Sequence, residues 1–298
     1  MPSSPSRFGL SAALTTPFDA GAEIDLGRLT RHARWCLDNG CGSVTVFGTT
    51  GEGASIGLAD RQTVLRALMG AGFAMRREVV AGVSAPSLAE AVSQAQLALH
   101  AGCRALLVAP PFYFKNVDDE GVYTWFAQLI WALGDEARDF ILYNIPSVTH
   151  VTLTVDLIGR LKAAFPKVII GVKDSSGDWD YAQRLLTAHK DIAILIGDER
   201  LLAKAVRLGA QGAISGIANI CPQVLQRIIE SGTPDERIPP LVAELLKYPV
   251  TPAIKAVVAH RAQDDAWMAT RPPLVDLGKA EAKRLCHTYD TLFAAVAA

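Results

Sequence analysis

The chain has 298 residues, of which half are apolar and a fifth charged, and its formal net charge is -1. This composition supplies a sizeable core and excludes a disordered chain, and the near-zero charge gives no reason to expect nucleic acid or an anionic membrane as a partner. No apolar run approaches the ~18–20 residues of a membrane span, and residues 1–7 carry no apolar signal segment. We therefore expect a cytoplasmic protein.

Short apolar runs alternate with longer amphipathic stretches along most of the chain. Eight such runs are predicted strands, at residues 10–14, 43–47, 79–83, 105–109, 140–143, 168–172, 192–196 and 212–214. Each is followed by a predicted helix, at residues 25–39, 59–72, 87–100, 118–133, 154–164, 179–189, 199–208 and 222–231. Eight strand–helix pairs in series predict an α/β fold, the (β/α)8 TIM barrel. A doubly wound open sheet is the alternative, and a chain of this length would be expected to give it fewer strands.

The pattern changes after the eighth pair. Pro234, Pro239 and Pro240 interrupt it, and three helical stretches follow at residues 241–247, 252–261 and 277–295, with no strand between them. These stretches predict a helical appendage. We therefore divide the chain into a barrel over residues 1–232, which carries the active site, and a C-terminal helical extension over residues 233–298.

The sixth predicted strand leads directly into Lys173. In a (β/α)8 barrel the active site lies at the carboxyl ends of the strands, which places Lys173 at the mouth of the barrel. Burial there disfavours the charged ammonium, and a neutral amine can form a Schiff base with a carbonyl substrate. The alternative is a structural lysine that reaches out of the strand end and pairs with Asp174 or another carboxylate.

Other strand ends carry further candidate residues. Tyr143 closes the fifth strand, where a phenol beside Lys173 can shuttle protons, although it can equally be a packed aromatic with a hydrated hydroxyl. Asp198 and Glu199 follow the seventh strand. They either cap a helix and occupy its first turn or accept hydrogen bonds from substrate hydroxyls.

The second strand is followed by a glycine-rich loop, Gly48-Thr49-Thr50-Gly51-Glu52-Gly53. Glycines let backbone N–H groups approach an anion closely, and threonine hydroxyls add donors, so the loop can bind a carboxylate. The alternative is a tight strand-to-helix turn in which the glycines serve geometry alone. The loop has neither the Walker sequence nor the dinucleotide-binding spacing.

Three motifs together resemble the dihydrodipicolinate synthase / N-acetylneuraminate lyase family. They are Gly48-Thr49-Thr50-Gly51-Glu52, Tyr143-Asn144-Ile145-Pro146 and Gly171-Val172-Lys173-Asp174, in the family's order and spacing. The resemblance extends from residues 14–18 to residues 271–274. It implies a (β/α)8 barrel with a C-terminal helical extension, commonly a homotetramer, that binds pyruvate or another 2-oxo acid as a Schiff base.

The resemblance also implies roles for individual residues. Lys173 corresponds to the Schiff-base lysine and Tyr143 to the catalytic tyrosine, while Thr49, Thr50 and Gly51 belong to the loop that holds the 2-oxo acid carboxylate. Tyr113 resembles the tyrosine that crosses a dimer interface to complete a proton relay with Thr49 and Tyr143. The pocket-lining positions of the eighth strand correspond to Ile214 and Ser215.

The sequence departs from the dihydrodipicolinate synthases where their arginine binds the carboxylate of the aldehyde substrate. Val148 occupies that position and cannot form a bidentate ion pair; Lys115 or His150 would have to supply the charge from elsewhere. The Asp198-Glu199 pair is closer to the lyases that act on polyhydroxylated sugar acids. We therefore expect aspartate semialdehyde to be a poor substrate.

The sequence thus predicts a class I (Schiff-base) lyase that acts on pyruvate or another 2-oxo acid by reversible aldol cleavage of a 2-oxo sugar-acid-like substrate. Within this class, a 4-hydroxy-tetrahydrodipicolinate synthase and a 2-oxo or imino acid dehydratase or deaminase remain alternatives. A ligand-binding sensor barrel is the non-enzymatic alternative. The scattered cysteines and histidines show no metal-ligand spacing, so we expect no metal and no cofactor. The resemblance implies a homo-oligomer, a dimer or a tetramer.

Overall fold

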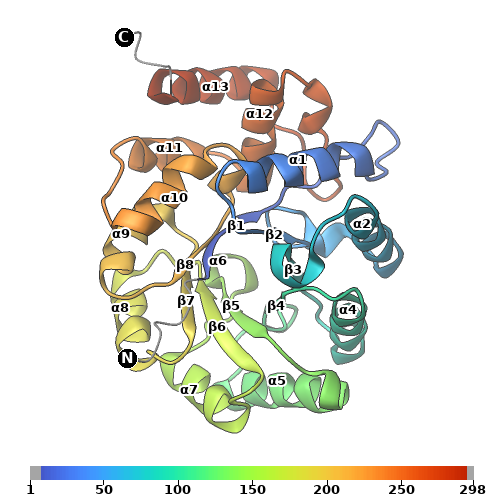
Figure 1. Ribbon diagram of the computed structural model, residues 1–298, viewed down its shortest axis with the longest axis vertical. Coiled ribbons are helices and arrows are strands. Elements are labelled where there is room, and N and C mark those ends of the chain that lie inside the picture. The colour runs from blue at the N-terminus through green and yellow to red at the C-terminus, as the bar shows by residue number, and fades with distance from the viewer. Residues whose placement is uncertain (1–7, 294–298) are drawn as a thin grey trace.

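The computed structural model describes residues 8–293 and shows a closed barrel of eight parallel strands, β1 to β8, in which β8 pairs with β1. Figure 1 shows the strands at the centre and the helices around them. The strands are β1 Gly9–Ala13, β2 Ser43–Val46, β3 Val79–Val83, β4 Ala105–Val108, β5 Phe140–Asn144, β6 Ile169–Asp174, β7 Ala193–Ile196 and β8 Gly212–Ser215. The predicted α/β class and TIM barrel are therefore confirmed.

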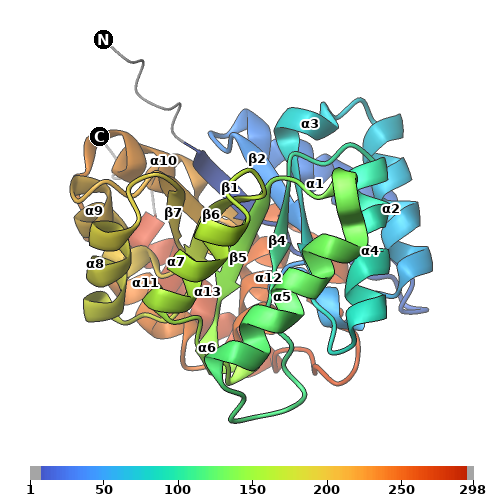
Figure 2. The same ribbon diagram turned by 90° about the horizontal axis from the view of Figure 1, so that it is seen from below.

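A long helix follows each strand and covers the outside of the sheet (Figure 2). These helices are α1 Leu26–Asp38, α2 Leu58–Gly70, α4 Leu88–His100, α5 Asp119–Leu133, α7 Val155–Ala164, α8 Trp179–Ala188, α9 Glu199–Arg207 and α10 Pro222–Ser231. Several begin at a side chain that accepts a backbone N–H bond from the first turn, as Asp25 does for α1 and Ser87 for α4. Two four-residue helices, α3 Met75–Glu78 and α6 Pro146–Thr149, were not predicted.

The alternation of side chains along each strand divides the core into two parts. Inward-facing residues such as Leu107, Ile141 and Leu195 fill the barrel, whereas outward-facing residues such as Val172 pack against the helices. Tyr143 and Lys173 are paired neighbours on β5 and β6. Because Val172 faces the helices, Lys173 faces the barrel interior.

Three further helices follow the barrel: α11 Ile238–Leu245, α12 Val250–Ala262 and α13 Lys279–Phe293. They agree with the predicted extension, although α11 begins earlier than expected, and the last predicted helical positions, 294–295, lie outside the described residues. Figure 1 shows them on one side of the barrel, beside α1 and α10. Within residues 8–293, no helix is long and apolar enough to cross a membrane.

Candidate active site

Lys173 and Tyr143 are in direct contact at the mouth of the barrel. Each is only 5% exposed, and the Lys173 amine donates to the Tyr143 hydroxyl at 3.2 Å. The same amine lies 4.3 Å from the centre of the tyrosine ring. Within residues 8–293, no carboxylate forms an ion pair with Lys173, so the structural alternative of a Lys173–Asp174 pair is wrong.

Asp174 lies on the opposite face of β6 and fixes the strand ends. Its carboxylate accepts from the Asn144 side-chain amide at 2.9 Å and from the Ser176 backbone N–H at 3.0 Å. Burial raises the pKa of this carboxyl. Asn144 in turn accepts from the Leu153 N–H at 3.0 Å. These bonds hold β5 and β6 in the register that brings Tyr143 and Lys173 together.

Thr49 continues this chain of polar groups, since its hydroxyl lies 3.4 Å from the Tyr143 hydroxyl. The loop that carries it is tightly bent. A Cβ at Gly53 would lie 1.9 Å from the Phe47 carbonyl oxygen, and one at Gly51 would lie 2.6 Å from the Leu14 oxygen, so both positions require glycine. The glycines at positions 51 and 53 therefore serve the tight turn, as the alternative interpretation of the loop predicted. Carboxylate binding by the loop remains a proposal.

A buried ion pair anchors the loop from behind. Glu52, in the left-handed region with a φ of 56°, is paired with Lys255 of α12, and neither side chain is exposed. The Arg271 backbone N–H donates to the same carboxylate at 2.9 Å. Arg61 of α2 donates to the Gly53 and Gly82 carbonyls at 2.8 and 2.7 Å. The C-terminal extension thus helps to shape the Thr49–Thr50 loop.

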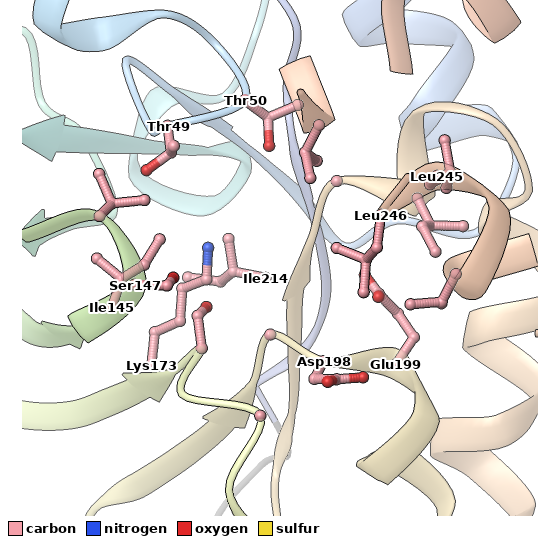
Figure 3. Close-up of a pocket in the computed structure, with 18 of the residues that line it drawn as sticks. Thr49, Thr50, Ile145, Ser147, Lys173, Asp198, Glu199, Ile214, Leu245 and Leu246 are labelled. Carbon is pink, nitrogen blue, oxygen red and sulfur yellow. The ribbon is translucent and has the colours of Figure 1, made fainter. Parts of the chain in front are cut away.

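A cavity of about 330 Å³ opens above Lys173 (Figure 3). Thr49, Thr50, Tyr143 and Ile214 line it on the barrel side. Its polar wall consists of Ser147, Ser175, Ser176, Asp198, Glu199 and Arg200, and its apolar wall consists of Val242, Leu245, Leu246, Val250 and Ile254 from the C-terminal extension. The cavity can therefore hold a small molecule with a polar and an apolar side.

A second cavity of about 330 Å³ adjoins the first, and both touch Thr49, Tyr143, Ile145 and Val148. Mostly apolar groups line it, namely Phe47, Val83, Leu107, Ala109, Phe112 and Leu274. Neither Lys173 nor any residue of β7 reaches it. The proton-bearing groups Thr49 and Tyr143 therefore stand between a polar and an apolar chamber.

Asp198 and Glu199 both line the first cavity, but their carboxylates are already bonded. Asp198 caps α9 and accepts from the Arg200 side chain at 2.6 and 3.0 Å. Glu199 accepts from the Ser215 hydroxyl at 2.5 Å, and burial raises the pKa of its carboxyl.

Three residues predicted for the site do not line the cavity. Ser215 is fully buried against Glu199, because neighbouring residues of a strand face opposite sides and Ile214 faces inward. Gly51 lies beneath the loop, where its carbonyl accepts from the Thr16 hydroxyl at 2.8 Å. Tyr113 is 73% exposed and contacts the equally exposed Phe114 edge to face.

The comparison with known proteins assigns the family. A profile of the dihydrodipicolinate synthetase family matches residues 7–291. The chain belongs to this family. It is 33% identical over 297 residues to an uncharacterised DapA-like lyase of Chloroflexus aurantiacus, covering 96% of this chain and 97% of that relative. The predicted family membership is thus confirmed, and the chain is a lyase of this family.

Solved structures agree with this family. A dihydrodipicolinate synthase from Agrobacterium tumefaciens superimposes with a TM-score of 0.94 and 52% identity, covering 96% of this chain and 100% of that one. YagE, an Escherichia coli prophage protein of the dihydrodipicolinic acid synthase family solved in complex with pyruvate, has a TM-score of 0.86 and 21% identity, covering 95% of this chain and 98% of that one. At that identity it supports the fold alone.

Arg200 is the charged residue of the cavity that the sequence analysis missed. Its only sequence signal is its place directly after the Asp198-Glu199 pair. Lys115 and His150 line neither cavity, although the sequence analysis considered them as possible sources of a positive charge for a substrate carboxylate. Val148 lines both cavities. In the part of the chain that the structure describes, no group of three or more His, Cys, Asp or Glu residues is arranged to hold a metal ion.

Proposed function

We propose that this family member forms a Schiff base between Lys173 and a 2-oxo acid such as pyruvate, and that it catalyses reversible aldol cleavage of a 2-oxo sugar-acid-like substrate. The observation that carries this proposal is the buried contact of 3.2 Å between the Lys173 amine and the Tyr143 hydroxyl, inside a cavity that also contains Thr49 and Thr50. The choice of pyruvate rests on the family, because YagE, another member of the dihydrodipicolinic acid synthase family, was solved in complex with pyruvate.

The proposed reaction begins when the amine attacks the ketone carbon and gives a carbinolamine. Tyr143 delivers the proton with which the hydroxyl leaves as water, and the protonated imine forms. In the cleavage direction the Tyr143 phenolate takes the proton of the C4 hydroxyl, the electrons of the C3–C4 bond pass to the iminium, and the aldehyde departs. The resulting enamine takes a proton at C3, and water then hydrolyses the imine, which releases the 2-oxo acid and the Lys173 amine. Thr49, 3.4 Å from the Tyr143 hydroxyl, passes protons to and from the phenol.

We assign the substrate carboxylate to Thr50 and the backbone around Gly51, with Ile214 as the apolar floor beside the reacting carbons. Asp198 and Glu199 form the polar end of the cavity. Ser215 contributes indirectly, because its hydroxyl donates to the Glu199 carboxylate and holds it in place. These assignments place the reacting ketone over Lys173. No metal or organic cofactor has a part in the proposed steps.

Tyr113 enters the proposal through a second copy of the chain. The exposed Tyr113–Phe114 pair is an apolar surface of the kind that contacts between chains cover. The apolar chamber beside Thr49 and Tyr143 is a suitable receptor for a partner's aromatic ring. We therefore propose that the protein is a homo-oligomer, a dimer or a tetramer. We also propose that it is cytoplasmic and that each subunit consists of the barrel over 1–232 and the helical extension over 233–298. Loss of assembly in Tyr113→Asp, measured by light scattering, tests this contact.

The second candidate function is condensation of pyruvate with aspartate semialdehyde, the reaction of a 4-hydroxy-tetrahydrodipicolinate synthase. It is favoured by the likeness to a protein named dihydrodipicolinate synthase at 52% identity. Dehydration or deamination of a 2-oxo or imino acid would use the same enamine. A sensor barrel would need neither the amine nor the phenol.

Exchange of the methyl protons of pyruvate in deuterated water tests the proposed function. Formation of the enamine makes these protons exchangeable, so their signal in the proton NMR spectrum should decay in the presence of enzyme. We expect decay with the wild type and none above the uncatalysed rate with Lys173→Ala. Equal decay with both proteins would contradict the assignment of Lys173.

A further inference from the structure

Arg200 brings a guanidinium into the cavity that contains Lys173. It is the second residue of α9 and forms a side-on bidentate pair with Asp198: Nε donates to Oδ1 at 3.0 Å and Nη2 to Oδ2 at 2.6 Å. The Arg200 backbone N–H also donates to Oδ1 at 3.1 Å. Both Asp198 oxygens are therefore engaged by Arg200, and Asp198 acts on the cavity by orienting this side chain.

The pair leaves one edge of the guanidinium open. A guanidinium carries five N–H donors arranged in forks, each of which fits a carboxylate. Asp198 occupies the fork of Nε and Nη2, and Nη1 has no hydrogen-bond partner among residues 8–293. The side chain is 42% exposed. The fork of Nη1 and Nη2 is thus free to bind a planar anion that enters the cavity.

The surroundings of Arg200 favour an anion. Glu199, the other carboxyl that lines the cavity, accepts from the Ser215 hydroxyl at 2.5 Å, and burial raises its pKa, which favours the neutral form. The other Lys, Arg, Asp or Glu side chains that line the cavity are Lys173 and Asp198. Arg200 offers a single free fork, and Lys173 is the only other lysine or arginine among the residues that line this cavity, so the site fits a carboxylate better than a dianionic phosphate.

The position of this site relative to Lys173 defines a substrate. Figure 3 shows Thr49 and Thr50 on one side of the Lys173 amine and Asp198 and Glu199 on the other side of the cavity. A 2-oxo acid with its carboxylate at Thr50 and its ketone at Lys173 extends its remaining carbons toward Asp198. We propose that the substrate carries a second carboxylate at this far end and that Arg200 binds it. This inference rests on the Schiff-base function proposed above.

The test compares matched pairs of 2-oxo acids that differ in the terminal group. Borohydride trapping, followed by intact mass, gives the half-saturating concentration for 2-oxoglutarate against 2-oxopentanoate and for 2-oxoadipate against 2-oxohexanoate. In the wild type we expect the half-saturating concentration of at least one dicarboxylate to be about tenfold to a hundredfold lower than that of its monocarboxylate partner. This ratio corresponds to the free energy of one charge-assisted hydrogen-bonded pair. Two carbon-chain lengths are compared, because the experiment also determines which length lets the second carboxylate reach Arg200.

Variants of Arg200 decide whether this side chain produces the preference. Arg200→Gln should bring the ratio within each pair close to one, and Arg200→Lys should keep part of it, because the charge remains while the fork is lost. Arg184→Gln, an exposed arginine of α8 outside both cavities, should retain the wild-type ratio. The ratio within one variant cancels differences in the amount of folded protein.

A wild-type ratio near one for both pairs, with pyruvate itself trapped normally, would overturn the second-carboxylate site and leave the Schiff-base function intact. A wild-type preference that persists in Arg200→Gln would equally overturn the assignment. Absence of a pyruvate adduct on the wild type would overturn the proposed function and this inference with it.

Discussion

The Glu52 carboxylate and the Lys255 ammonium form an ion pair without exposed side-chain surface, although 203 positions separate them in the sequence. Arg271 N–H completes the bonding of Glu52, and Lys255 also donates to the Ala269 carbonyl at 2.5 Å. A buried pair is stable only when both charges are fully bonded. The pair therefore joins the Thr49–Thr50 loop and the C-terminal extension into one unit.

Removing one partner of the Glu52–Lys255 pair should lower the free energy of unfolding. Glu52→Gln or Lys255→Met leaves a buried charge without its partner, which costs about 3–5 kcal/mol of unfolding free energy. Urea denaturation measures this loss, and the double variant Glu52→Gln/Lys255→Met should lose less than the sum of the two. A double variant whose loss equals that sum would show that the two side chains act independently.

Tyr143→Phe removes the phenol that contacts both Lys173 and Thr49. We expect turnover to fall by about 10²–10⁴-fold, the range for a lost acid–base group, while the melting temperature changes little. Steady-state assays of pyruvate release measure the effect. Unchanged turnover, with chemistry shown to be rate-limiting, would reduce Tyr143 to a packing role.

His32 makes stability depend on pH. It is buried between Trp35 and Trp267, and burial lowers its pKa from 6.5 to about 4. Between these values the unfolded chain binds a proton that the folded chain does not, so the stability rises with pH over this window and is lost as pH falls through it. Complete protonation of His32 in the unfolded chain alone lowers the free energy of unfolding by about 3 kcal/mol, since each pKa unit corresponds to ~1.4 kcal/mol.

Urea denaturation at several pH values between 4 and 7 measures this dependence. His32→Gln retains a donor for Asn219, the hydrogen-bond partner of His32 at 3.0 Å, but does not titrate. Its slope of stability against pH should be smaller than that of the wild type. Identical slopes would show that other groups control the acid sensitivity.

Val148 lines both cavities and is 54% exposed. Because its side chain cannot bind a carboxylate at this position, we expect low kcat/KM for aspartate semialdehyde in the wild type. Val148→Arg should raise it by about tenfold to a hundredfold, and Val148→Leu should not. Efficient wild-type turnover that disappears in Arg200→Gln would place the carboxylate clamp on Arg200 and favour the synthase alternative.

The sequence predicted the barrel because its signals are local. Each strand is a short apolar run, and several helices begin at a recognisable capping residue such as Asp25 or Ser87. Since all strands are parallel, their carboxyl ends meet at one face, which was enough to bring Lys173, Tyr143 and Thr49 together. Period-two alternation could also have shown that Ile214 and Ser215 face opposite sides.

The missed features depend on contacts between distant segments. Lys255 reads as one lysine in a helix, and nothing near it in the sequence indicates Glu52 as its partner. Arg200 lies in the first turn of α9, where a basic residue is electrostatically unfavourable, yet Asp198 binds it there. The apolar wall supplied by α11 and α12 likewise depends on how the extension packs on the barrel.

The central claim is that Lys173 is the amine that binds the 2-oxo acid covalently. Incubation with pyruvate and borohydride, followed by intact mass and peptide mapping, tests it most directly. We predict one adduct per chain, located on Lys173 and absent from Lys173→Ala, whereas Lys255→Met should still be labelled at Lys173. An adduct of equal yield on Lys173→Ala, or one that maps to another lysine, would contradict the account.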